Sequence, residues 1–146
     1  GRIEGPGKVI FANGTVYEGA FKDAKNHGMG KITYLDGHSY DGDWYEGLKQ
    51  GIGLEIQPDG STYNGTFVAG RPHGKGELKL ANGFKYSGEW TDGEITGLGK
   101  ATYNNGNVYS GYLKKAQPHG VGKMIYISGR VFKGIWDNGK EKTPLM

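Results

Sequence analysis

Apolar and polar side chains alternate along two neighbouring stretches of the chain, residues 28–35 and residues 39–45. A period of two residues is typical of a β-strand with one buried face, so each stretch predicts a strand. Asp36 and Gly37 lie between the stretches and favour a tight turn, which predicts a β-hairpin. One face of this hairpin carries Gly28, Gly30, Ile32, Tyr34, Tyr40, Gly42 and Trp44.

The same pattern recurs every 23 residues with no insertion. Each copy opens with Gly-x-Gly, then has a turn glycine, an aromatic-x-Gly pair and a large apolar residue. Six tandem copies predict one continuous repeat domain, which we expect to be part of a longer array. We divide the chain into residues 1–4 (the tail of a preceding repeat), repeats at 5–27, 28–50, 51–73, 74–96, 97–119 and 120–142, and a C-terminal tail at 143–146.

The length of the loop decides which residues of a hairpin face each other. A two-residue Asp-Gly loop would pair Leu35 with His38. We favour a three-residue loop, because the segment 58–60 has Pro at its first turn position and Gly where a left-handed conformation is required. This loop pairs Tyr34 with His38, Ile32 with Tyr40, Gly30 with Gly42 and Gly28 with Trp44.

The facing glycines would leave a shallow trough, in which an aromatic ring of the next hairpin can lie against bare backbone. A single hairpin is not stable alone, so stacking has to bury the aromatic face. The predicted fold is therefore all-β: an elongated single-layer solenoid of six stacked antiparallel β-hairpins.

The repeat closely resembles the MORN (membrane occupation and recognition nexus) repeat. Residues 28–44 match its pattern of Gly-x-Gly, Tyr-x-Asp-Gly and Tyr-x-Gly-x-Trp nearly position for position, and the resemblance covers essentially the whole chain. It implies stacked antiparallel hairpins in a single sheet. The uninterrupted array is most similar to the repeat-only MORN proteins, some of which build cytoskeletal assemblies in protozoa.

Two positions depart from this pattern. Glu55 and Gln57 stand where the third repeat should have apolar residues, so that strand is expected to be bulged or locally re-registered. Leu113 replaces an aromatic residue in the fifth repeat.

Composition narrows the possible functions. The 146 residues include 29 glycines and 12% aromatics but only 5 prolines, which argues against a disordered linker. The chain has no cysteine, which excludes disulfides and thiol chemistry. A net charge of +3 is too small to indicate nucleic-acid binding. We expect a cytoplasmic protein.

No residue pattern indicates catalysis, a metal site or a cofactor. His27, His73 and His119 share one repeat position, but copies in alternate repeats would lie about 20 Å apart, too far to share a metal. We interpret them as structural or solvated histidines. Gly-x-Gly is no nucleotide loop, because it begins a strand and no helix follows it.

Two interaction surfaces are candidates. Lys8, Lys31, Lys100 and Lys123 share one position on the polar face and could meet anionic lipid headgroups, although exposed sheets also carry lysine for solubility. The same face of the last two repeats is unusually apolar, and such a patch usually marks an interface unless the tail at 143–146 folds back over it. The predicted homo-oligomer interface consists of Leu98, Val108, Tyr112, Val121, Ile125, Ile127, Val131 and Ile135.

The sequence therefore predicts a non-catalytic scaffold, associated with the cytoskeleton, that forms homodimers through its C-terminal repeats and binds other cytoskeletal proteins. The alternative function is a peripheral membrane module that binds anionic phospholipids.

Overall fold

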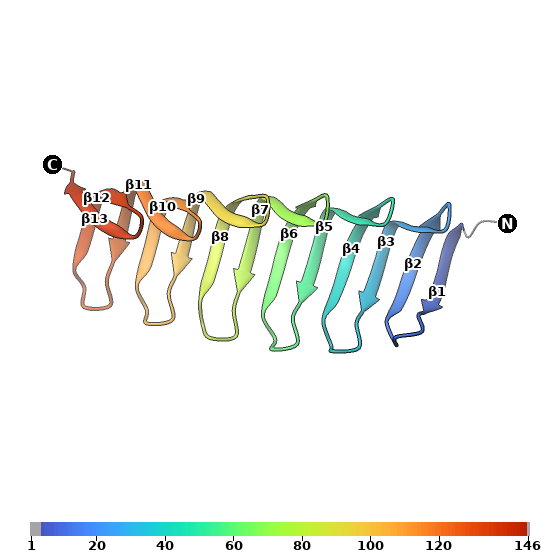
Figure 1. Cartoon of the computed structure of the whole chain (residues 1–146). Coiled ribbons are helices and arrows are strands. Elements are labelled where there is room, and N and C mark those ends of the chain that lie inside the picture. The colour runs from blue at the N-terminus through green and yellow to red at the C-terminus, as the bar shows by residue number, and fades with distance from the viewer. Residues whose placement is uncertain (1–3, 146) are drawn as a thin grey trace. The chain divides into compact units, whose positions relative to one another are not determined.

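The computed structural model describes residues 4–145, which form thirteen β-strands and no helix (Figure 1). Met146 and residues 1–3, where most of the predicted preceding repeat falls, lie outside the described residues. Contacts divide the chain into two units, residues 1–71 and 72–146, and each is described by itself.

Each unit is built from strands that follow one another in sequence and pair antiparallel with their neighbours within the unit. The first unit contains β1 (Gly5–Ile10), β2 (Val16–Lys22), β3 (Lys25–Thr33), β4 (Ser39–Tyr45), β5 (Leu48–Ile56) and β6 (Thr62–Val68). The second contains nearly all of β7 (Arg71–Lys79), then β8 (Lys85–Thr91), β9 (Glu94–Thr102), β10 (Val108–Lys114), β11 (Gln117–Ile125), β12 (Val131–Asp137) and β13 (Lys140–Pro144). The predicted all-β fold of stacked hairpins is confirmed.

The predicted three-residue loop is also confirmed. In the β3–β4 hairpin the Tyr34 amide donates to the His38 carbonyl (2.8 Å), and Gly37 has φ +95°, in the left-handed region. The predicted register follows, with Ile32 opposite Tyr40, Gly30 opposite Gly42 and Gly28 opposite Trp44.

Successive hairpins are joined by two-residue turns with two left-handed residues, such as Glu46 (φ +47°) and Gly47 (φ +84°) between β4 and β5. Glycine suits the second position of this turn because it has no Cβ to clash with the backbone. Four of the six turns have glycine there. The turns after β2 and β10 instead hold Ala24 (φ +65°) and Ala116 (φ +67°) in this left-handed conformation, which is strained for a residue with a side chain.

Within each unit, aromatic rings that lie on glycines join successive hairpins. The Tyr40 ring of β4 lies over Gly53 of β5, so close that a Cβ added to Gly53 would be 2.4 Å from Tyr40 Oη. Tyr17 lies in the same way over Gly30, Tyr86 over Gly99 and Tyr109 over Gly122. The trough prediction is therefore confirmed with one correction: the ring comes from the preceding hairpin, not from the next one.

The hydroxyl of each such tyrosine is used at a β-bulge. Between β4 and β5 the register shifts after the Gly42–Gly53 pair, so that Asp43 alone faces the three residues 50–52. Asp43 consequently has no ladder partner for its carbonyl, and Tyr40 Oη donates to that oxygen (2.7 Å). The same bond recurs at Tyr17, Tyr63, Tyr86 and Tyr109.

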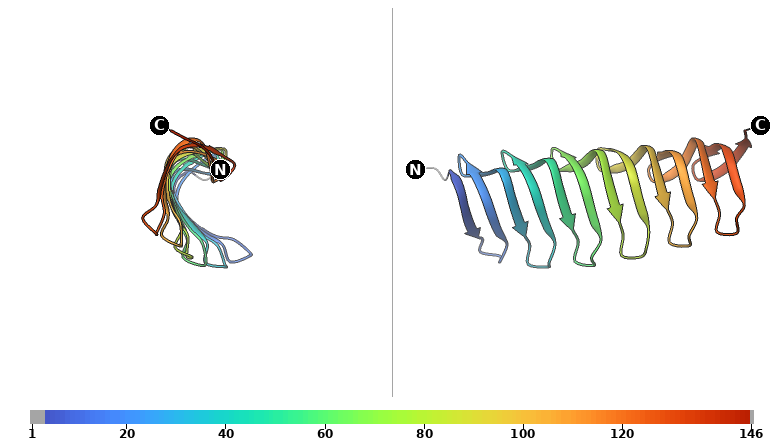
Figure 2. Two further views of the ribbon diagram at one scale, coloured as in Figure 1. Left: turned by 90° about the vertical axis from the view of Figure 1, so that its left-hand side faces the viewer. Right: turned by 180° about the vertical axis from the view of Figure 1, so that it is seen from behind.

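The buried side chains lie on one face of the strands, here called the aromatic face; the opposite face is called the outer face. Tyr17, Tyr40 and Tyr109 are completely buried, and Leu113 is equally buried in the place of an aromatic residue. A single-layer sheet can bury one face only if the sheet bends around it, and the strands do curve along their length (Figure 2, left). Edge-to-face ring contacts, such as Tyr40 against Trp44 at 5.1 Å, pack the aromatic face.

The ring-on-glycine contact predicts a strong effect of a single methyl group. In Gly122→Ala the new Cβ would lie 1.9 Å from Tyr109 Oη, so the ring must move, and we expect a loss of about 2–3 kcal/mol in the free energy of unfolding. Gly7→Ala is the matched control, because it has the same repeat position but its nearest neighbour is Phe21 Cε2 at 3.5 Å. Urea unfolding measures both; equal losses would contradict the assignment.

Buried tyrosines also predict how stability depends on alkaline pH. Burial raises the pKa of Tyr63, Tyr86 and Tyr109 from 10.0 to about 12. Below pH 10 these phenols are neutral in both states, so their contribution is fully present; above it the unfolded chain ionises first and the contribution is lost. We expect the free energy of unfolding to fall as pH rises from 10 to 12, with the absorbance of these three phenolates appearing together with loss of the sheet signal in circular dichroism. Ionisation of Tyr63, Tyr86 and Tyr109 in a fully folded chain near pH 10 would contradict this.

Candidate interaction surfaces

The three equivalent histidines are parts of the turns between hairpins. His27 Nδ1 accepts a hydrogen bond from the Glu46 amide (3.2 Å), at the first turn residue after β4. His73 does the same for Asp92 and His119 for Asn138. In the other repeats Gln50 Oε1 and Thr96 Oγ1 accept the equivalent bond, from Ala69 and Lys115. This position therefore requires a hydrogen-bond acceptor, and the structural interpretation of the histidines accounts for them.

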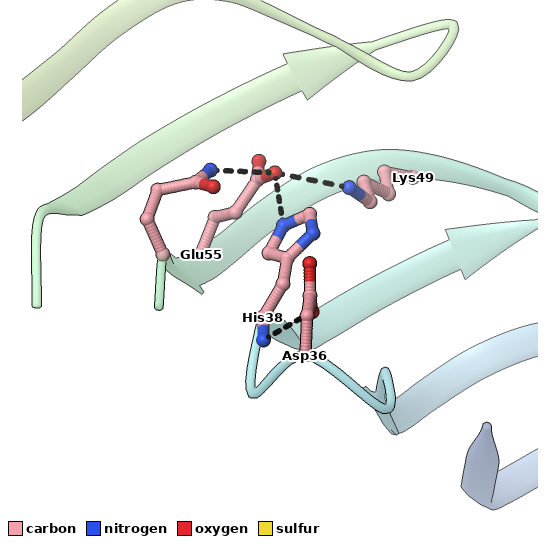
Figure 3. A network of polar contacts seen from close by, with 5 residues as sticks. Asp36, His38, Lys49 and Glu55 are labelled. Carbon is pink, nitrogen blue, oxygen red and sulfur yellow. Dashed lines mark hydrogen bonds and ion pairs between the residues drawn. The ribbon is translucent and has the colours of Figure 1, made fainter. Parts of the chain in front are cut away.

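Glu55 and its neighbours form a polar network on the aromatic face of the first unit (Figure 3). Glu55 Oε1 accepts hydrogen bonds from His38 Nε2 (2.7 Å) and Lys49 Nζ (3.3 Å), and all three side chains are largely buried. Lys49 Nζ also lies 5.1 Å from the Tyr40 ring centroid. Glu55 pairs with Tyr40 and Tyr63 in the ordinary register, so the expected re-registration of this strand is wrong: the carboxylate stays on the aromatic face because Lys49 and His38 satisfy it.

The predicted interface residues lie mostly in two rows on the outer face of β9–β12. Cross-strand pairing places Leu98 beside Tyr112 and Val121 beside Ile135, while a second row runs through Val108, Ile125 and Val131. All except Val108 are more than one third exposed. Ile127 belongs to neither row, because it lies in the loop between β11 and β12, where its amide donates to Asn107 Oδ1 (2.9 Å).

Rows of apolar residues that run across three or four strands distinguish this region from the outer face of the first unit. There apolar residues form single pairs, Ile10 with Val16 and Tyr45 with Leu48, or face polar residues, as Met29 faces Asp43, Ile52 faces Thr66 and Ile56 faces Thr62. Isolated apolar residues are normal on a protein surface, whereas contiguous ones mark interaction sites.

A basic row, which the sequence did not reveal, separates the two apolar rows. Register places Lys100, Ser110, Lys123 and Lys133 side by side across β9–β12, and we call them the lysine row. The equivalent row of the first unit alternates in charge, since Glu18 lies between Lys8 and Lys31 and Asp41 follows Lys31. The four lysines of the predicted lipid stripe therefore fall into two environments, and only Lys100 and Lys123 have no acidic neighbour in their row.

The tail extends the sheet and leaves the outer face open. β13 pairs with β12, with Thr143 beside Ile135 and Pro144 beside Gly134. Glu141 of this strand binds the Arg130 guanidinium, which holds the pKa of the Glu141 carboxyl below its usual value. Val121, Ile125 and Val131 are exposed. Residues 143–145 therefore do not fold back over the apolar patch, which was the alternative to an interface.

Within residues 4–145 no cluster of three or more His, Asp or Glu side chains could hold a metal ion. The same part of the chain contains no helix long and apolar enough to cross a bilayer.

Comparison with known proteins identifies the family. The sequence model of the MORN repeat matches residues 1–16, 17–39, 40–62, 63–85, 86–108 and 109–129. The chain belongs to the MORN repeat family. The matched segments that begin at residues 17, 40, 63, 86 and 109 each start at the tyrosine in the second strand of a hairpin, so they keep the 23-residue period.

The solved structures with a similar fold include the TCP domain of SAS-4 from Drosophila melanogaster, in complex with a proline-rich motif of Ana2. The similarity has a TM-score of 0.54 at 12% sequence identity and covers 90% of this MORN chain and 72% of that domain's chain. No curated protein is similar enough in sequence to count as a relative.

The turn bond of the histidines predicts which replacements are tolerated. In His73→Ala the Asp92 amide loses its acceptor (3.1 Å), and we expect a loss of about 1 kcal/mol in the free energy of unfolding. His73→Gln should cost less than about 0.5 kcal/mol, because Gln50 of the second repeat fills the same role. Thermal and urea unfolding compare the two variants. An equal loss in both would mean that the imidazole itself is needed.

Proposed function

We propose that this MORN protein is a non-catalytic scaffold, located in the cytoplasm and associated with the cytoskeleton, that self-associates through the outer face of β9–β12. The observation that carries the proposal is the pair of exposed apolar rows in this region. Family membership supports an interaction role, and the resemblance to repeat-only MORN proteins favours the cytoskeleton. That the TCP domain of SAS-4 binds a motif of another protein supports protein binding on this kind of sheet.

The lysine row restricts how two copies can meet. A face-to-face pair that buries the apolar rows brings Lys100, Lys123 and Lys133 of one copy near the same residues of the other. Like charges repel more strongly at low ionic strength, where the Debye length exceeds about 10 Å. Self-association through this face should therefore strengthen as salt is added, whereas binding of an acidic partner would weaken.

A double substitution tests self-association. Ile125→Glu with Val131→Lys replaces one cross-strand apolar pair by an oppositely charged pair, which suits an exposed sheet and should leave the fold intact. We expect the parent to dimerise at about 100 μM and the variant to be monomeric by light scattering. Ile56→Glu with Thr62→Lys, at the equivalent positions of the third repeat, is the matched control and should dimerise like the parent. A parent that stays monomeric at every salt concentration would refute self-association.

Binding of anionic lipid is the second candidate function, and the lysine row between two apolar rows is the observation that favours it. In co-sedimentation with phosphatidylserine vesicles at about 0.15 M salt we expect little binding of the parent, because exposed charges are already screened. Strong sedimentation that is lost in Lys100→Glu/Lys123→Glu but kept in Lys8→Glu/Lys31→Glu would make lipid binding the better proposal.

A further inference from the structure

The outer face of the second unit carries more positive charge than its lysine row alone. The row next to it begins with Lys79 and Lys85, which are directly opposite each other across β7 and β8, and continues with Thr102 of β9. With Lys100, Lys123 and Lys133 they form what we call the basic band: five exposed lysines spread over β7–β12. Among the described residues, none of the five forms an ion pair.

The Lys79–Lys85 pair is an unfavourable arrangement for an isolated sheet. Like charges directly opposite each other on neighbouring strands are destabilising. The same two positions hold Thr33 and Ser39 in the second repeat and Ile125 and Val131 in the sixth, so the repeat itself does not demand lysine there. An anionic partner would relieve this repulsion.

A shallow depression lies beside this pair. It has a volume of about 280 Å³, and its lining includes Lys79, Lys85, Lys100, Ser87 and Thr102. Ammonium and hydroxyl groups both donate hydrogen bonds to carboxylates, and those from the charged ammonium are the stronger ones. Glu77 is the one acidic residue among those that line it.

We infer that the basic band binds an acidic, extended polypeptide segment of a partner protein, with carboxylates on the lysines and apolar side chains against the flanking rows. Five strand spacings of about 4.8 Å span about 24 Å, which an extended segment of seven or eight residues covers. The apolar rows of β9–β12 lie on both sides of Lys100 and Lys123, so a segment that mixes glutamate with apolar residues is complementary in both respects.

The shape of the sheet favours a flexible chain over a flat membrane as the anionic partner. Successive hairpins of the second unit are rotated about the stacking direction (Figure 2, left). At about 10° or more per strand, five steps turn the outward direction of the lysines by about 50° or more between β7 and β12. A planar bilayer cannot meet all five lysines in these orientations, whereas an extended polypeptide can follow them.

This inference rests on the proposed function in one respect, that the outer face of the second unit is a docking surface for proteins. The two proposals place different partners on the lysine row. A second copy of the chain would bring lysines against lysines, whereas an acidic segment would neutralise the charge of the row. The two occupants compete, so an acidic segment should displace a second copy of the chain.

The test is fluorescence anisotropy with a labelled peptide of about ten residues in which glutamate alternates with serine, at about 50 mM salt. We expect binding that disappears at about 0.5 M salt and with a peptide that has glutamine for glutamate. Lys100→Ser/Lys123→Ser and Lys79→Ser/Lys85→Ser should each weaken binding about tenfold or more. The control Lys8→Ser/Lys31→Ser removes the same charge at the repeat positions of Lys100 and Lys123, and should change the affinity less than about twofold, because the cross-strand neighbours Glu18 and Asp41 lower the net positive charge around those lysines.

Three results would overturn the inference: no binding by the parent at low salt, equal weakening in the control variant, or binding to phosphatidylserine vesicles without binding to the peptide. Light scattering of the same samples keeps the proposed function separate. A parent that dimerises but does not bind the peptide would refute the acidic partner and leave self-association standing. A monomeric parent that binds the peptide through the basic band would refute self-association and support the acidic partner.

Discussion

The contact between a tyrosine ring and the bare backbone of a glycine on the following strand holds this fold together. Tyr109 covers Gly122 so closely that any Cβ at position 122 would displace the ring, and its hydroxyl donates to the carbonyl of the bulge residue Tyr112 at 2.7 Å. One side chain thus fills the space of a missing Cβ and satisfies a carbonyl that the bulge removes from the ladder. Because each ring belongs to the preceding hairpin, each of these contacts joins two successive hairpins of one unit and fixes the spacing of 13 residues between Tyr109 and Gly122.

A consequence of this arrangement is that the two faces of the sheet have separate tasks. The aromatic face is buried by stacking, and its glycines and tyrosines are required by the close contact between ring and backbone. The outer face contributes to stacking at few positions, such as Asp43, whose Oδ2 accepts from the Ile52 amide (3.0 Å) of the following hairpin, so most of its residues can differ from repeat to repeat. The alternating charges around Lys31 and the uncompensated charges around Lys123 therefore occupy equivalent positions on the same scaffold. Differences in surface charge along the array arise on this face.

Repeat 3 shows how far the aromatic face itself can vary. Glu55 occupies a position that is apolar in the neighbouring repeats, and its charge is tolerated only because Lys49 and His38 reach it from the same strand and from the preceding loop. A buried carboxylate without such partners would be costly, and removal of either partner leaves an uncompensated charge. The network replaces apolar packing by hydrogen bonds while the register of β5 stays that of the other repeats.

The period, the hairpins, the three-residue loop and the identity of the buried face could all be read from the sequence. They depend on interactions within one repeat, and six copies of the same pattern make each of them visible. The two surfaces were predicted only as sets of residues. What the sequence could not show is which side chains of different strands become neighbours: the acids beside Lys8 and Lys31, the lysine row that divides the apolar patch, and the partners of Glu55. Those neighbours are set by the register between strands, which includes a bulge at each step from one hairpin to the next. The shift of two residues at each bulge leaves the alternation of apolar and polar residues within a strand unchanged. It therefore cannot be predicted from that alternation and is determined only by the packing of one hairpin on the next.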